Sequence, residues 1–158
     1  MGEVVRAAIE SVPKGQFEAA QAQGFSYLQR MGYIILPQSI PVMLPPMVNQ
    51  VETHVFNQQI EAQQIMEQYG THIMAWGPFA EGRNNYFSNP VLKAVGGKYG
   101  KSVAQTALRF LIQRGVIVIP KSTHKNRMEE NLNVFDFHLS AEDMEAIGKL
   151  DKGRSLFF

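Results

Sequence analysis

Four consecutive β-branched residues at positions 116–119 constrain the fold of this chain more than any other feature. The run Val-Ile-Val-Ile lies between Gly115 and Pro120. A continuous apolar run of this length is typical of a strand buried on both faces, as in parallel sheets. Pro120 ends the strand because proline has no N–H to donate to a neighbouring strand. The stretch therefore predicts a short, buried strand in an α/β protein.

The chain on either side repeats this alternation of strand and helix. Strands are expected at 47–51, 71–76 and 116–119, and helices at 57–69, at 90–99, from Ser102 to Gly115, after Thr123 and after Ser140. Apolar residues at a spacing of three and four mark the helices. Asn89 before a proline, Ser102 and Ser140 are typical caps at helix starts. Alternating elements of this kind predict a parallel sheet with right-handed crossovers and about three β/α units.

The first part of the chain follows another pattern. Residues 1–11 fit either a short strand or the start of a helix. Apolar residues recur at helical spacing over 16–31, which predicts one amphipathic helix that ends at Gly32. Residues 33–36 are compatible with a strand.

Four prolines then mark a boundary. Pro37, Pro41, Pro45 and Pro46 crowd ten residues, and proline disfavours both a central strand and a helix interior. We expect an irregular loop there. We therefore divide the chain into an atypical N-terminal segment, 1–45, and a regular α/β part, 46–158.

Polar residues follow the strand that ends at Pro120. Lys121 and Ser122 come first, then Thr123 as the expected N-cap, then Arg127 one turn into the next helix. A strand-to-helix junction with free N–H groups, a positive helix end and two cations suits a phosphate monoester. The alternative is a solvated basic helix start with no ligand. The residues alone leave both interpretations open.

Composition limits the classes of partner. The net charge is +1 with both signs interspersed, so the chain has no basic field for nucleic acid. The absence of cysteine excludes disulfides and thiol chemistry. No run of 18 apolar residues and no leader-like segment is present, so we expect no membrane partner and a cytoplasmic location.

Three stretches in order carry a resemblance to a known family. They are Val-Asn-Gln-Val-Glu-Thr-His (48–54), Ala-Trp-Gly-Pro-Phe-Ala (75–80), and Pro-Lys-Ser (120–122), which continues through Arg127 to Val-Phe-Asp-Phe-His-Leu-Ser-Ala-Glu-Asp-Met (134–144). With this spacing, residues 46–158 resemble the C-terminal part of aldo-keto reductases. A whole (β/α)₈ barrel takes about 250 residues. The resemblance therefore implies a partial (β/α)₈ TIM barrel of about three C-terminal β/α units, preceded by an atypical N-terminal helical segment.

The resemblance implies an NADP(H)-dependent oxidoreductase that reduces a small carbonyl substrate to an alcohol, and it places ten residues at the cofactor. Gln50 matches the residue that binds the nicotinamide carboxamide, and Trp76 matches the aromatic residue that stacks on the nicotinamide ring. Gly77 stands where many members have serine, which implies the loss of one pyrophosphate contact, and the backbone of Phe79 lies near the pyrophosphate. The positions that match those around the 2′-phosphate are Lys121, Ser122, Thr123 and Arg127, and those that match the adenine edge are Glu130 and Asn131.

From the residues alone, Gln50 also fits a strand-end amide that satisfies loop backbone, and Trp76 also fits a core aromatic. His124 is expected to be exposed and not catalytic. Glu52 and His54 are too few to form a metal site, so none is expected.

The family's catalytic Asp, Tyr, Lys and His belong to the first half of the barrel, and no matching motif occurs here. We therefore assign no catalytic residue; Tyr27 and Tyr33 lie outside any family motif. Three interpretations remain: a partial NADPH surface that is inactive alone, an enzyme completed by a second chain, and a non-catalytic structural or regulatory module. A disrupted gene would also explain residues 1–45. Open sheet edges predict self-association.

Overall fold

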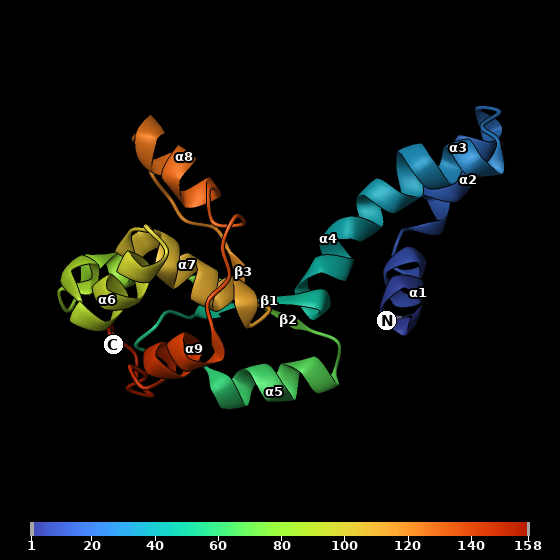
Figure 1. Ribbon diagram of the computed structural model, residues 1–158. Helices are drawn as coiled ribbons and strands as arrows, with labels where there is room; N and C mark the ends of the chain where they lie inside the picture. The colour runs from blue at the N-terminus through green and yellow to red at the C-terminus, as the bar shows by residue number, and fades with distance from the viewer. Residues whose placement is uncertain (1, 158) are drawn as a thin grey trace. The chain divides into compact units, whose positions relative to one another are not determined.

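The computed structural model describes residues 2–157, without the side chains of residues 4 and 43–47. The chain divides into two compact units, Met1–Asn49 and Gln50–Phe158. Figure 1 shows the elements of both units in chain order.

The first unit is helical. Its elements are α1 (Gly2–Glu10), α2 (Lys14–Ala22), α3 (Tyr27–Arg30), the π-helical turn η1 (Met31–Ile35) and α4 (Leu36–Met47). The ambiguous start of the chain is therefore a helix. Ala8, Ala20 and Ile35 are buried, and α1 packs against α4.

The prediction of one helix over 16–31 is wrong, because the chain turns in its middle. Gly24 has a φ of +80°, a left-handed conformation that ends α2 and that glycine adopts without strain. Ser26 then starts α3 by accepting a hydrogen bond from the Gln29 N–H, and the Gln29 side chain accepts one from the Ser26 N–H. The expected strand at 33–36 is also wrong, since these residues are helical.

The prediction of an irregular loop at the prolines is wrong as well, since α4 contains them. Pro37 and Pro41 are four residues apart, so their missing N–H donors fall on the same side of the helix. The wider π-helical turn ahead of Pro37, in which the Leu36 N–H donates to the Met31 carbonyl, gives its ring more room than an α-turn does.

The second unit has the predicted α/β order. Its strands are β1 (Val48–Glu52), β2 (His72–Trp76) and β3 (Ile117–Val118), with β1 beginning just ahead of the unit boundary. Its helices are α5 (Ile60–Gln68), the 3₁₀ turns η2 (Ala80–Gly82) and η3 (Tyr86–Ser88), α6 (Pro90–Lys98), α7 (Val103–Gln113), α8 (Lys125–Leu132) and α9 (Ala141–Gly148). The strand order is β1-β2-β3, and β2 pairs parallel to β3 with Met74 opposite Ile117.

Most predicted helix starts are confirmed. Asn89 accepts hydrogen bonds from the first turn of α6, Ser102 forms a capping box at α7, and Ser140 accepts one from the Asp143 N–H at α9. Thr123 is not the cap of α8, because the helix begins at Lys125 and His124 occupies the N-cap position.

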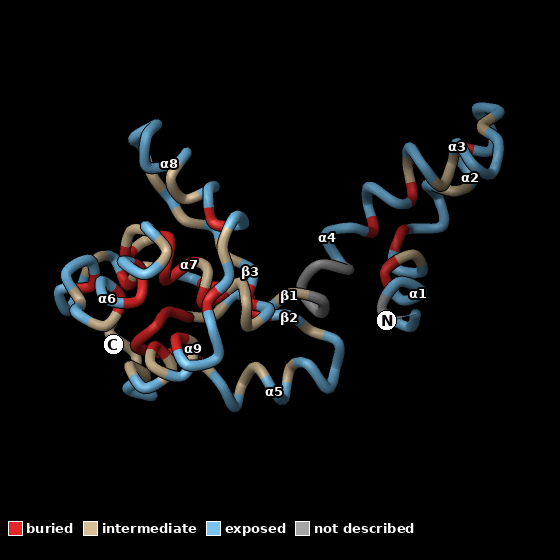
Figure 2. Tube along the Cα trace, viewed as in Figure 1, coloured by how far each residue is buried: buried red, intermediate tan, exposed pale blue. Residues whose placement is uncertain are grey.

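The core of this unit lies between the sheet and its helices. Figure 2 shows buried residues gathered around α7 and α9. They include Val55, Phe56, Ile73, Ala75, Tyr86, Leu92, Phe110, Leu111, Val116, Leu139 and Ile147.

The 116–119 run is covered on one face only. Val116 is buried, whereas Ile117 and Ile119 are 37% and 62% exposed. The prediction of burial on both faces is therefore wrong. Successive side chains of a strand point to opposite faces, and within residues 2–157 the three-stranded sheet does not close to enclose the second face.

Candidate functional site

A cavity of about 430 Å³ lies at the carboxyl ends of β2 and β3. Residues that follow these two strands line it together with residues of α7 and α8. The lining residues are Phe79, Phe87, Ser102, Val103, Ala104, Lys121, Ser122, Arg127, Glu130 and Asn131. In parallel α/β folds, ligands bind at this end of the strands.

The loop and helix after β3 supply most of the polar groups. Arg127, Glu130 and Asn131 are three and four residues apart on α8, so they share one face of the helix. Lys121 and Ser122 come from the end of the strand. The Ser122 hydroxyl accepts a hydrogen bond from the His124 N–H at 3.2 Å, which tightens the turn between strand and helix.

Two cations, Lys121 and Arg127, line this cavity. Among residues 2–157, no hydrogen bond or ion pair engages the side chains of Lys121 or Arg127. Lys125, two residues before Arg127 on α8, pairs with Glu129 instead. The donor set of an ammonium, a guanidinium and a hydroxyl is suited to a phosphate dianion, which accepts charge-assisted hydrogen bonds.

Gln105 fixes the position of α8, and sequence reasoning missed it. This residue of α7 is 7% exposed. Its Nε2 donates to the carbonyl oxygens of Glu130 at 3.2 Å and Asn133 at 2.8 Å. Its Oε1 accepts from the Ser102 N–H at 3.1 Å. The signal was the Ser-x-x-Gln pattern at the start of α7, which predicts a capping box but says nothing of a second helix.

Six of the ten predicted site residues line the cavity together. They are Phe79, Lys121, Ser122, Arg127, Glu130 and Asn131. Thr123 lies outside the lining, and its hydroxyl is 3.4 Å from His124 Nδ1.

The structure does not bring the other three predicted residues to the cavity. Gln50 is exposed on β1. Trp76 ends β2, is 39% exposed and contacts the ring of Phe157. Gly77 has a φ of +64°, so a side chain there is strained. These three belong to the ends of β1 and β2.

Two features bear on other classes of function. Within residues 2–157, no helix is long and apolar enough to cross a membrane. In the same part of the chain, no three His, Cys, Asp or Glu side chains lie together in a way that would hold a metal ion.

Comparisons with known proteins agree on one family. The sequence profile of the aldo/keto reductase family matches residues 28–152. Aldose reductase C of Dictyostelium discoideum is 43% identical over 108 residues, which cover 68% of this chain and 34% of that protein. Glyoxal reductase of Bacillus subtilis is 43% identical over 109 residues, which cover 69% of this chain and 38% of that protein.

Solved structures give the same result. A Gox0644 mutant in complex with NADPH matches with a TM-score of 0.66 and 37% identity, over 69% of this chain and 40% of that one. An aldo-keto reductase of Bombyx mori in complex with NADP matches with a TM-score of 0.65 and 35% identity, over 70% of this chain and 39% of that one. The chain thus spans well under half the length of these relatives, and the partial barrel fold is confirmed. This chain belongs to the aldo/keto reductase family.

Proposed function

We propose that the second unit binds NADP(H) and holds the adenosine 2′-phosphate in the cavity between the end of β3 and α8. The observation that carries this proposal is the meeting of Lys121, Ser122 and Arg127 in one cavity with neither cation paired in the described chain. A preference for NADP(H) over NAD(H) follows, because only the former has this phosphate. The NADP-bound state of the related structures supports the same cofactor.

The remaining cavity residues fit the rest of the nucleotide. The Glu130 carboxylate can accept from the exocyclic amine of adenine, and the Asn131 amide can donate and accept at the ring edge. Phe79 lies at the strand end, where its backbone N–H suits a pyrophosphate oxygen. We assign Thr123 to the rim of the phosphate site.

We place the nicotinamide at the ends of β1 and β2. The Gln50 amide offers both a donor and an acceptor to the carboxamide, and the Trp76 ring offers a surface for stacking. Gly77 brings the backbone close without a hydroxyl, so one pyrophosphate contact is missing.

The first prediction tests the phosphate site. Arg127→Ala should remove most of the preference for NADPH over NADH, at a cost of about 1 to 3 kcal/mol in NADPH binding. Isothermal titration calorimetry with both nucleotides measures this. Lys125→Ala is the matched control, because Lys125 lies on the same helix outside the cavity and is 87% exposed. Equal affinity of the unmodified chain for NADH and NADPH would contradict the role of Lys121, Ser122 and Arg127.

A second proposal concerns the chemistry. When bound, NADPH supplies the hydride for carbonyl reduction, and the developing alkoxide needs a proton donor, which contributes about 10² to 10⁴ in rate. No tyrosine lines the cavity within the described chain. Tyr99 and Lys98 both bind Asp143. The Tyr99 hydroxyl donates to Asp143 at 2.6 Å and accepts from the Ser140 N–H, and Tyr99 lies outside the cavity.

The second prediction is therefore that the purified chain alone oxidises NADPH little or not at all with a reactive aromatic aldehyde. Absorbance at the NADPH band measures this, with a complete family member as the positive control. Turnover abolished by Tyr27→Phe or Tyr33→Phe would show a donor in the first unit. Turnover that survives both Trp76→Ala and Arg127→Ala would place the reaction at another site.

A further inference from the structure

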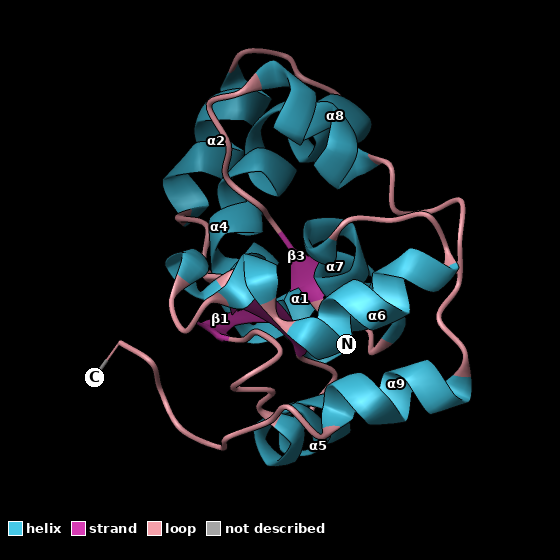
Figure 3. Cartoon of the chain, turned by 60° about the vertical axis from the view of Figure 1, so that its left-hand side comes forward, coloured by secondary structure: helices cyan, strands magenta, loops and turns pink. Residues whose placement is uncertain are grey.

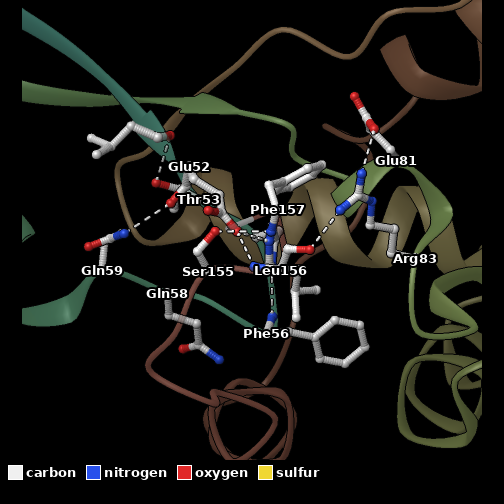
Figure 4. Close-up of polar contacts among 12 residues, drawn as sticks. Glu52, Thr53, Phe56, Gln58, Gln59, Glu81, Arg83, Ser155, Leu156 and Phe157 are labelled. Atoms are coloured by element: carbon white, nitrogen blue, oxygen red, sulfur yellow. Dashed lines mark hydrogen bonds and ion pairs between the residues drawn. The ribbon is translucent and has the colours of Figure 1, made fainter.

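The segment after α9 contains no helix or strand and runs as a loop to the C-terminus (Figure 3). Lys152 N–H donates to the Phe56 carbonyl at 2.9 Å. Farther along, Leu156 hydrogen-bonds to Glu52 and Arg83 (Figure 4). The ring of Phe157 contacts that of Trp76. The three partners come from different parts of the unit.

Glu52 is the first anchor of this segment. Its Oε1 accepts hydrogen bonds from the Leu156 N–H at 3.0 Å and from His54 Nε2 at 3.0 Å, and Ser155 also hydrogen-bonds to the carboxylate. His54 is fully buried, and its Nδ1 accepts from the Phe56 N–H at 3.2 Å. The neutral His54 ring therefore carries its proton on Nε2 and donates it to Glu52. This hydrogen bond holds the carboxylate in place for its contacts with residues 155 and 156.

Arg83 is the second anchor. Its Nη1 donates to the Leu156 carbonyl at 2.7 Å, and its guanidinium carbon lies 4.4 Å from the centre of the Phe157 ring. The guanidinium thus holds both the backbone and the ring, by a hydrogen bond and a cation–π contact. Figure 4 shows Arg83 and Glu52 on the two sides of Leu156.

Glu52 and Arg83 together fix the position of Phe157 beside Trp76. Its ring centre is 4.6 Å from that of Trp76, with an interplanar angle of 62°. The ring also lies 3.7 Å from the point where a side chain at Gly77 would begin. Trp76 keeps 39% of its surface exposed despite this contact.

From this arrangement we infer that Phe157 is a positioning residue for Trp76. The segment 153–157, anchored by Glu52 and Arg83, braces the indole in one orientation and leaves the rest of its surface open for a planar ring. The inference rests on the proposed function, in which that ring is the nicotinamide. An indole that is already ordered loses less conformational entropy when the ligand binds, so the affinity is higher.

The test separates the two ends of the cofactor. NADPH contacts both the phosphate cavity and Trp76, whereas adenosine 2′,5′-bisphosphate contacts only the cavity. In Phe157→Ala, affinity for NADPH should fall about two- to twelvefold, the range for loss of one aromatic pair, and affinity for the bisphosphate should stay unchanged. Phe135→Ala is the control, since Phe135 is 68% exposed and lines neither site.

A second readout needs no cofactor. Trp76 is the single tryptophan of the chain, so its fluorescence reports on this site alone. Acrylamide quenching should increase in Phe157→Ala, increase less in Arg83→Met, and return to the original value in Phe157→Tyr. Unchanged bisphosphate affinity shows in the same samples that the unit remains folded.

The outcomes distinguish the two proposals. If the unmodified chain does not bind the bisphosphate, the proposed function is wrong, and the role of Phe157 in positioning Trp76 for the nicotinamide is wrong with it. If the unmodified chain binds the bisphosphate but Phe157→Ala binds NADPH with the same affinity as the unmodified chain, only the positioning role of Phe157 is wrong. Tighter NADPH binding by Phe157→Ala also overturns it, because the ring would then cover the stacking surface.

Discussion

At the scale of single residues, the Glu52 and His54 pair combines a buried base with a hydrogen-bonded acid. Burial lowers the pKa of His54 below its ordinary 6.5, and this outweighs the attraction of Glu52. Burial acts to raise the pKa of Glu52, but hydrogen bonds from Ser155, the Leu156 N–H and His54 outweigh it, so the pKa lies below its ordinary 4.5. The pair is therefore a neutral imidazole against a carboxylate.

The third prediction, after those for Arg127 and turnover, is that the second unit loses stability on acidification through both residues. Each has a lower pKa when folded, so the unfolded chain binds the proton more readily and stability rises with pH. The His54 contribution is complete above about pH 6.5 and is lost below it, and the Glu52 contribution is lost below about pH 4.5.

Urea unfolding from pH 7 to 4 measures this loss. His54→Gln should flatten the dependence between pH 7 and 5, and His124→Gln, which changes an exposed histidine, is the matched control. A slope in this range that His54→Gln leaves intact would assign it to other groups.

At the scale of elements, the second unit could be predicted because its local signals agree with each other. Asn89, Ser102 and Ser140 cap helices whose apolar residues face one core, so the local preference and the packing select the same starts. The start of α8 was predicted wrongly, because Ser122 and Thr123 suit a cap by residue type, whereas the N-cap is His124, whose side chain makes no capping hydrogen bond. The Ser122 hydroxyl instead accepts from the His124 N–H and forms the turn ahead of the helix.

The first unit could not be predicted in this way. Its prolines favour a loop, and the structure places them in α4. A proline penalty is a local quantity, whereas the packing of α1 on α4 is a tertiary one that no spacing in the sequence reveals. The same limit applies to Phe157, whose contact with Trp76 joins residues about eighty positions apart in the sequence.

At the scale of the whole molecule, most of the candidate phosphate site could be predicted, because its residues lie within eleven positions of one another, from Lys121 to Asn131. They follow one strand and lie on the helix directly after it, so local chain geometry alone brings these residues together. Gln105 and Phe157 could not be found, since their roles depend on how distant segments return to the site.

The fourth prediction is self-association through the sheet. β3 pairs with β2 on one side, and no other strand of the described chain lies along its second edge. Ile117 and Ile119 are exposed beside that edge, and an apolar, unpaired strand is a template for another chain. We therefore expect the chain to form oligomers and to bind a hydrophobic dye, as light scattering and dye fluorescence would show.

Ile119→Lys should reduce both signals, because a charged side chain at an edge strand opposes pairing. Ile65→Lys is the matched control, since Ile65 is 57% exposed on α5, away from the strand edge. A lysine at either position raises solubility alike, so only a larger effect at Ile119 assigns association to the sheet. If the unmodified chain scatters light as a stable monomer and binds no dye, its open edge is not an association surface, and completion of the barrel by a second copy is excluded with it.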